Sequence, residues 1–195
     1  MRILSWRGRL VPALAALCIT AACSKSEPAP ASDAPQYEPA ATVKDIMQSI
    51  VDPAADQVWG AVTTVQTAQG TIDKAPKTAE EWLMVRHGAV GMSEAANLLM
   101  MPGRHVAQPH EKSDTPGVEL EPAEMEVLIN KDRAAFIQRA KALHEAGMAA
   151  VAAADAKDSQ KLFEVGEQIE QACENCHSHY WYPNEKIPPV PASPR

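Results

Sequence analysis

Two cysteines and a histidine stand together late in the sequence, as Cys173-Glu174-Asn175-Cys176-His177. Thiols three positions apart can each form a thioether with a vinyl group of haem, and the adjacent imidazole can bind the iron. A CxxC pair can also be a redox dithiol or half of a zinc site. A redox dithiol usually opens a helix after a strand, and no second cysteine pair remains to complete a zinc site. The motif therefore predicts one covalent haem c, anchored by Cys173 and Cys176, with His177 as an axial iron ligand.

The first 22 residues have the features of an export signal. Three arginines precede an apolar stretch at residues 10–18, which is too short to span a membrane as a stable helix. Residues 20–24 resemble the processing box of bacterial lipoproteins, in which the chain is cut before Cys23 and that thiol is lipidated. Thr20 stands where leucine is usual, and the alternative is ordinary cleavage near residue 22 without a lipid. Ser24 favours, by the same resemblance, sorting to the outer membrane.

The compartment follows from the signal and the haem motif together, because covalent haem attachment takes place outside the bacterial cytoplasm. We expect the protein on the periplasmic side of the bacterial envelope. It is either an outer-membrane lipoprotein anchored through Cys23 or a soluble periplasmic protein.

Charge narrows the choice of partners. From residue 23 onward the chain carries 15 basic and 25 acidic residues, a net charge of −10. This balance argues against nucleic acid and anionic lipid headgroups as partners, so membrane contact is expected only through the lipid anchor. A redox partner protein with a basic surface is the partner that the charge favours.

Composition divides the chain into a signal, a tether, one domain and a tail. Residues 23–42 are rich in proline, alanine, serine and acidic residues, which predicts a disordered tether. Residues 184–195 predict a disordered tail. The remaining residues 43–183 have a length suited to one domain.

The domain has the pattern of an all-α protein, with few aromatic residues, abundant alanine and no alternation of β-branched residues. Four helices are predicted. They cover residues 43–66, residues 78–101, a third stretch from Pro122 or Asn130 to Ala154, and residues 158–181. The core-facing positions are Val43, Ile46, Ile50, Ala54, Val58, Val62 and Val65 in the first; Trp82, Val85, Ala89, Met92, Ala96 and Leu99 in the second; Phe136, Ala140, Leu143, Gly147 and Val151 in the third; and Leu162, Val165, Ile169, Ala172 and Cys176 in the fourth.

Local signals refine these helices. Pro53 predicts a kink or a restart in the first helix, with Asp52 as the cap of its second half. Thr78 and Glu81 predict a capping box at the start of the second. Residues 104–121 predict a loop whose length suggests a role. Because Cys173, Cys176 and His177 continue the core stripe of the fourth helix, the haem is expected to lie between helices.

A four-helix domain with its CxxCH on the last helix, followed by Tyr180, resembles the cytochrome c′ family. The resemblance covers residues 43–183 and implies an antiparallel four-helix bundle with haem c on the C-terminal helix. Trp181 stands where the family often has a basic residue, so a gas-site role for that residue does not carry over. Relatives that keep a low-spin iron place a methionine opposite the histidine. Met47 is then the candidate sixth ligand, because the first helix begins where the fourth ends. Members of that family are often homodimers, whereas a tethered lipoprotein need not be one.

The leading functional hypothesis is a one-electron carrier that is not an enzyme, since His/Met ligation suits reversible electron transfer. If Met47 does not reach the iron, the alternative is a five-coordinate haem protein that binds NO or CO. A third is a subunit of a larger redox enzyme that docks through the 104–121 loop. Arg104 and Arg86 are both candidates to pair with a haem propionate. His105 and His110 have a spacing that suits a metal, but no further ligand completes such a site.

Overall fold

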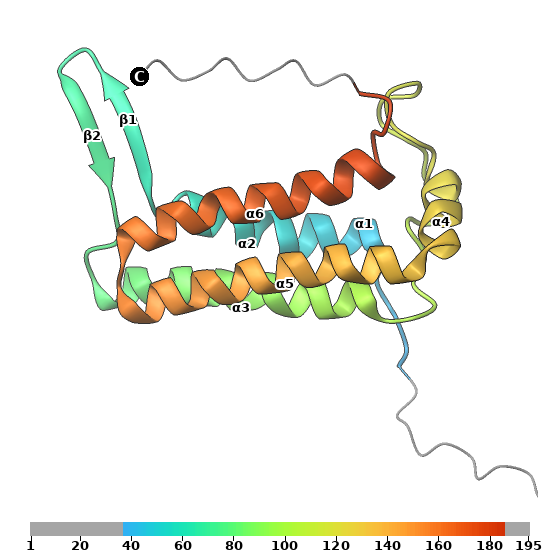
Figure 1. Ribbon diagram of the computed structural model, residues 1–195, viewed down its shortest axis with the longest axis horizontal. Helices are drawn as coiled ribbons and strands as arrows, with labels where there is room; N and C mark the ends of the chain where they lie inside the picture. Colours follow the sequence, from blue (N-terminus) through green and yellow to red (C-terminus); the bar gives the residue numbers. More distant parts are fainter. Residues whose placement is uncertain (1–36, 186–195) are drawn as a thin grey trace, which may run out of the picture. The chain divides into compact units, whose positions relative to one another are not determined.

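The computed structural model describes residues 37–185. The predicted signal at residues 1–22, the candidate lipidation site Cys23, most of the tether and the end of the tail lie outside these residues. The described part is mostly helical with one small hairpin (Figure 1). Its elements are α1 (Val43–Ile46), a π-helical turn η1 (Met47–Val51), α2 (Asp52–Trp59), β1 (Thr63–Thr67), β2 (Gly70–Lys74), α3 (Ala79–Met100), α4 (Pro122–Lys131), α5 (Arg133–Ala156) and α6 (Ser159–Tyr180).

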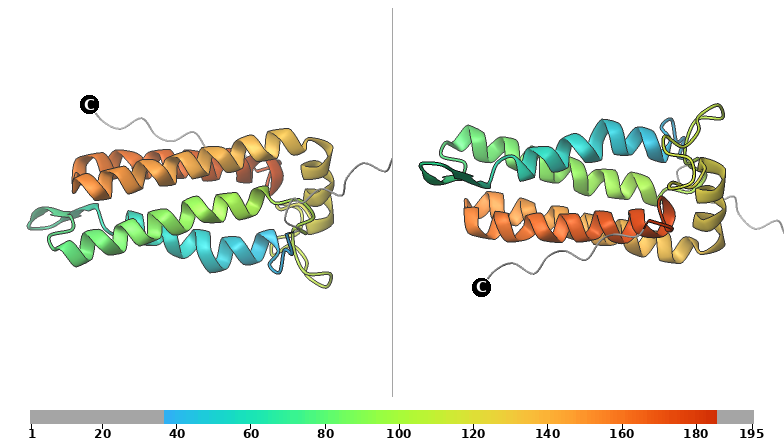
Figure 2. Two further views of the ribbon diagram at one scale, coloured as in Figure 1. Left: turned by 90° about the horizontal axis from the view of Figure 1, so that it is seen from below. Right: turned by 90° about the horizontal axis from the view of Figure 1, so that it is seen from above.

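Helices α3, α5 and α6 pack together, and α2 packs against α3 and α6. Successive long stretches alternate in direction, so α1 begins at the same end at which α6 finishes (Figure 1). Seen from two further sides, α5 and α6 form one pair, and α3 with the α1–α2 stretch forms another (Figure 2). None of the helices within residues 37–185 has the length and apolarity needed to cross a membrane.

The core-facing positions predicted for α3, α5 and the body of α6 are confirmed. Trp82, Leu99, Phe136, Leu162 and Ile169 are all buried, as are the smaller residues between them. A β-carbon added at Gly147 would lie only 3.2 Å from the carbonyl oxygen of Ala89. Absence of a side chain at Gly147 is therefore what lets α5 approach α3 so closely.

The prediction of a first helix over residues 43–66 was wrong after residue 59. The helix ends at Trp59, and Thr63–Thr67 pairs with Gly70–Lys74 as an antiparallel hairpin. The segment is dense in threonine, valine and isoleucine, which favour extended backbone, and Gly70 takes the positive φ that the turn requires. Val65, predicted to face the core, is 50% exposed and pairs with Ile72 across the hairpin. The β-branched residues of this segment therefore favour a hairpin over a continuation of the helix.

The third predicted stretch is two helices. Asp132 adopts a non-helical conformation between α4 and α5, and its side chain accepts a hydrogen bond from the backbone N–H of Ala135 at 3.0 Å. This aspartate acts as the N-cap of α5, which explains why the helical pattern restarts there. The capping box of Thr78 and Glu81 is confirmed.

The interruption before Pro53 also differs from the prediction. Asp52 is itself helical and its side chain caps nothing, so the chain does not restart there. The helix instead widens into the π-helical turn, and the backbone N–H of Asp52 donates to the carbonyl oxygen of Met47.

Candidate functional site

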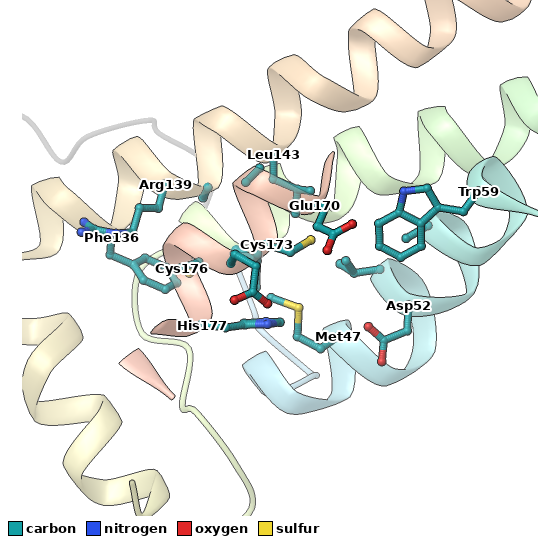
Figure 3. Close-up of a pocket in the computed structure, with 16 residues that line it drawn as sticks. Met47, Asp52, Trp59, Phe136, Arg139, Leu143, Glu170, Cys173, Cys176 and His177 are labelled. Carbon is teal, nitrogen blue, oxygen red and sulfur yellow. The ribbon is translucent and has the colours of Figure 1, made fainter. Parts of the chain in front are cut away.

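All four residues predicted to hold the cofactor line one cavity of about 390 Å3 (Figure 3). Cys173, Cys176 and His177 come from the last two turns of α6, and Met47 comes from η1. The cavity is also lined by Val51, Asp52, Ala55, Trp59, Leu99, Phe136, Arg139, Ala140, Leu143, Glu170, Ala172 and Glu174. Side chains from four helical stretches thus enclose it, and most of them are apolar.

The two thiols are free, half-buried and adjacent on one helical face. Burial raises the pKa of both Cys173 and Cys176 to about 11. Near Cys173 the carboxylates of Asp52, Glu174 and Glu170 raise the pKa further, whereas the positive charge of Arg139 opposes the shift at Cys176. Both groups are therefore protonated thiols at neutral pH.

His177 is half-buried beside the thiols. Burial lowers its pKa, against the opposing influence of the Glu174 and Asp52 carboxylates. The Trp181 ring meets the imidazole edge-on, with centroids 5.0 Å apart, and Tyr182 lies 6.1 Å from it. A neutral imidazole keeps a lone pair on one ring nitrogen, which is the form that binds a metal.

Met47 reaches the same cavity from η1, and Figure 3 shows its side chain extending toward that of His177. Among the methionines of the described residues, Met47 alone lines this cavity. Met92 is buried in the core, Met84 and Met148 are exposed, and Met125 lines a neighbouring cavity. An imidazole nitrogen from α6 and a thioether sulfur from η1 form a donor pair that suits a transition-metal ion.

A second cavity of about 210 Å3 shares Met47, Asp52, Phe136, Cys176 and His177 with the first. The long loop closes it, through residues that include Val106, Ser113 and Glu119. The loop is itself fixed to both ends of the site. The backbone N–H of Val43 donates to the carbonyl oxygen of His105 at 2.9 Å, and that of Leu120 donates to Trp181 at 2.8 Å. The loop therefore joins the helix that carries Met47 to the helix that carries His177.

Arg139 is a site residue that the sequence prediction missed. Among the described residues that line the first cavity it supplies the one permanent positive charge, and its Nε donates to the carbonyl oxygen of Asn175 at 3.0 Å. It stands three residues after Phe136, a spacing that could have placed it beside the core stripe. The predicted Arg86 instead pairs with Asp155 at 2.8 Å, and Arg104 donates to the carbonyl oxygens of Ala41 and Leu98.

The remaining candidates are placed elsewhere. The Nδ1 of His105 lies 3.0 Å from a carboxylate oxygen of Glu126, and residues 37–185 contain no group of three or more His, Cys, Asp or Glu that could hold a metal ion. Tyr180 is buried and lines the second cavity, with its ring edge-on to Phe136 at 5.5 Å. The Tyr182 hydroxyl donates to Glu174 at 2.8 Å, which braces the end of α6.

Comparison with known proteins gives no relative for this arrangement. No family model, curated protein or solved structure matches the chain. The cavity and the residues that line it are therefore what indicates a function.

Proposed function

We propose that the protein is an exported c-type cytochrome that binds one haem covalently and serves as a one-electron carrier. The observation that carries the proposal is the convergence of Cys173, Cys176, His177 and Met47 on one cavity. The chemistry of these side chains fits a covalently bound haem. The thiols are free, the imidazole is biased toward its neutral form, and the apolar walls and volume are those of a cofactor site.

Each residue has a separate role in this proposal. Cys173 and Cys176 hold the cofactor covalently, His177 donates to the iron from α6, and Met47 donates from η1. The bound haem supplies reversible one-electron exchange at its iron. Leu99, Phe136 and Leu143 keep water from that position, and ligation by His177 and Met47 favours a high reduction potential.

The fold supports the resemblance to cytochrome c′. We regard the α1–α2 stretch, α3, α5 and α6 as the four helices of an antiparallel bundle, because neighbouring stretches run in opposite directions. The hairpin and α4 are additions to that plan. In this assignment the haem-bearing helix is α6.

Charge at the mouth of the cavity supports a basic redox partner. Asp52 and Glu170 are exposed there on facing helices, and Glu174 lies beside them. A partner that presents lysines and arginines would approach the cavity faster and in a preferred orientation.

Absorption spectra of the haem-loaded protein, oxidised and reduced, with and without CO, test the proposal. A low-spin spectrum that CO does not change, and that Met47→Ala converts to high spin, is the expected result. Met125→Ala is the matched control, because Met125 lines only the neighbouring cavity. A high-spin wild type that binds CO and is unchanged by Met47→Ala would contradict Met47 ligation. NO or CO binding would then be the better-supported function.

A further inference from the structure

The helix that carries Met47 is not a regular α-helix at that point. Residues Met47–Val51 form the π-helical turn, in which the N–H of Asp52 donates to the carbonyl oxygen five residues earlier. An α-helical bond would span four residues. The turn therefore holds one residue more than an α-helix would over the same rise.

Pro53 explains why the turn lies here. Proline has no backbone N–H, and in an α-helix its ring would collide with the carbonyl group of Ser49, four residues earlier. The N–H of Asp52 bonds the carbonyl oxygen of Met47, five residues earlier, instead of the one four residues earlier. A wider turn of this kind is one way in which a helix accommodates a proline. Asp52, the residue immediately before the proline, thus already makes a π-helical hydrogen bond.

The extra residue changes which side chains face inward. Ile46 and Val51 are 1% and 2% exposed although they are five positions apart. In a regular α-helix two such residues point in directions about 140° apart. If the π-helical turn became α-helical, the helical residues before Val51 would rotate about the helix axis by the angle of one residue, about 100°. Met47 lies within the rotated segment.

We infer that Pro53 is a positioning residue for the site, because the turn that it imposes sets the direction in which Met47 enters the cavity. Pro53 is exposed and does not line the cavity, so it acts only through the helix. The consequence for iron ligation rests on the proposed function of Met47. The effect on the backbone does not.

The test compares the haem-loaded full chain with its Pro53→Ala and Pro53→Gln variants. Both restore an N–H and remove no buried contact, so at least one is expected to fold. Crystal structures should show residues 47–51 as α-helix in at least part of the population, with the Met47 side chain turned. Spectra should show a high-spin fraction, and CO affinity should rise about three- to tenfold as the Met47-bound fraction falls. Met47→Ala shows the spectrum and CO affinity expected when no Met47 ligation remains. Pro76→Ala, in the link between β2 and α3, is the matched proline control.

Two results would overturn the inference. One is a variant that keeps the π-helical turn as its single conformation together with a wild-type spectrum. The other is a straightened helix whose Met47 side chain keeps its direction. A high-spin wild type would contradict Met47 ligation instead, and the crystal structures of the variants would still decide whether Pro53 sets the turn.

Discussion

At the level of single residues, the number of thioether bonds that Cys173 and Cys176 form with haem can be measured. Each thiol is expected to hold the haem through one thioether, so either single alanine variant retains the haem after denaturation and the double variant releases all of it. Mass spectrometry of acid-denatured protein measures the attached haem directly. Ser178→Ala, on the same helix, is the control, since Ser178 lines neither cavity. Denatured wild type without the mass of a haem would rule out covalent attachment.

Burial of the same thiols makes the stability of the haem-free protein depend on alkaline pH. The pKa of each rises from 9.0 to about 11 in the folded protein. Above pH 9 the unfolded chain loses protons that the folded protein keeps, so the free energy of unfolding falls as pH rises. The slope approaches about 1.4 kcal/mol per pH unit for each thiol.

Urea unfolding at about pH 8 and about pH 10 measures this loss. The variant Cys173→Ala/Cys176→Ala should show a much flatter dependence on pH. An equal loss of stability in both proteins would mean that other groups cause it.

Spacing alone could identify the three residues of α6, because i, i+3 and i+4 positions share a helical face whatever surrounds them. Arg139 was not predictable in the same way. A charged residue beside a core stripe most often points to solvent, and Arg139 lines the cavity only because α6 brings Asn175 within reach of its guanidinium. Its role therefore comes from packing between helices.

At the level of elements, the contact between α3 and α5 depends on the missing side chain at Gly147. Gly147→Ala should lower the free energy of unfolding by about 1–3 kcal/mol, because the new methyl group would press on Ala89 and Ser93. Gly91→Ala, on α3, is the matched control. No atom lies within 4 Å of its added β-carbon, and it should raise stability by about 0.5–1 kcal/mol. Equal effects of the two substitutions in urea unfolding would contradict this account.

The elements differed in how far the sequence could predict them. Regular apolar spacing predicts the boundaries of α3 and α6 to within about one residue, because one face of each helix is packed along its whole length. The hairpin was missed since both strands are largely exposed, so no buried alternation marks them. At Pro53 the sequence predicts a kink or a restart, because it shows that the proline must disturb the helix but not how the backbone accommodates it.

For the whole molecule, charge should control the rate of electron exchange. Reduction by a cationic reagent such as hexaammineruthenium(II) should slow about tenfold as ionic strength rises from about 0.01 M to about 0.5 M, because salt screens the attraction. An anionic reductant should show the opposite trend. Stopped-flow absorption measures both rates.

Matched variants locate the charges that matter. Asp52→Asn/Glu170→Gln removes two charges at the mouth of the cavity. Asp73→Asn/Glu80→Gln removes two from the hairpin and the start of α3. The first pair should weaken the salt dependence more. An equal effect of both pairs would show that net charge, rather than charge at the cavity, attracts the reagent.

The shared end of α1 and α6 has a further consequence for unfolding. If Met47 and His177 bind one iron, the metal closes a chain loop that runs from residue 47 to residue 177, across nearly all of the described part. Opening so long a loop releases more conformational freedom than opening a short one. Losing the bond between the iron and Met47 would then remove the cross-link between the two ends of the domain. Displacement of that bond by an added ligand should therefore lower the free energy of unfolding of the whole domain.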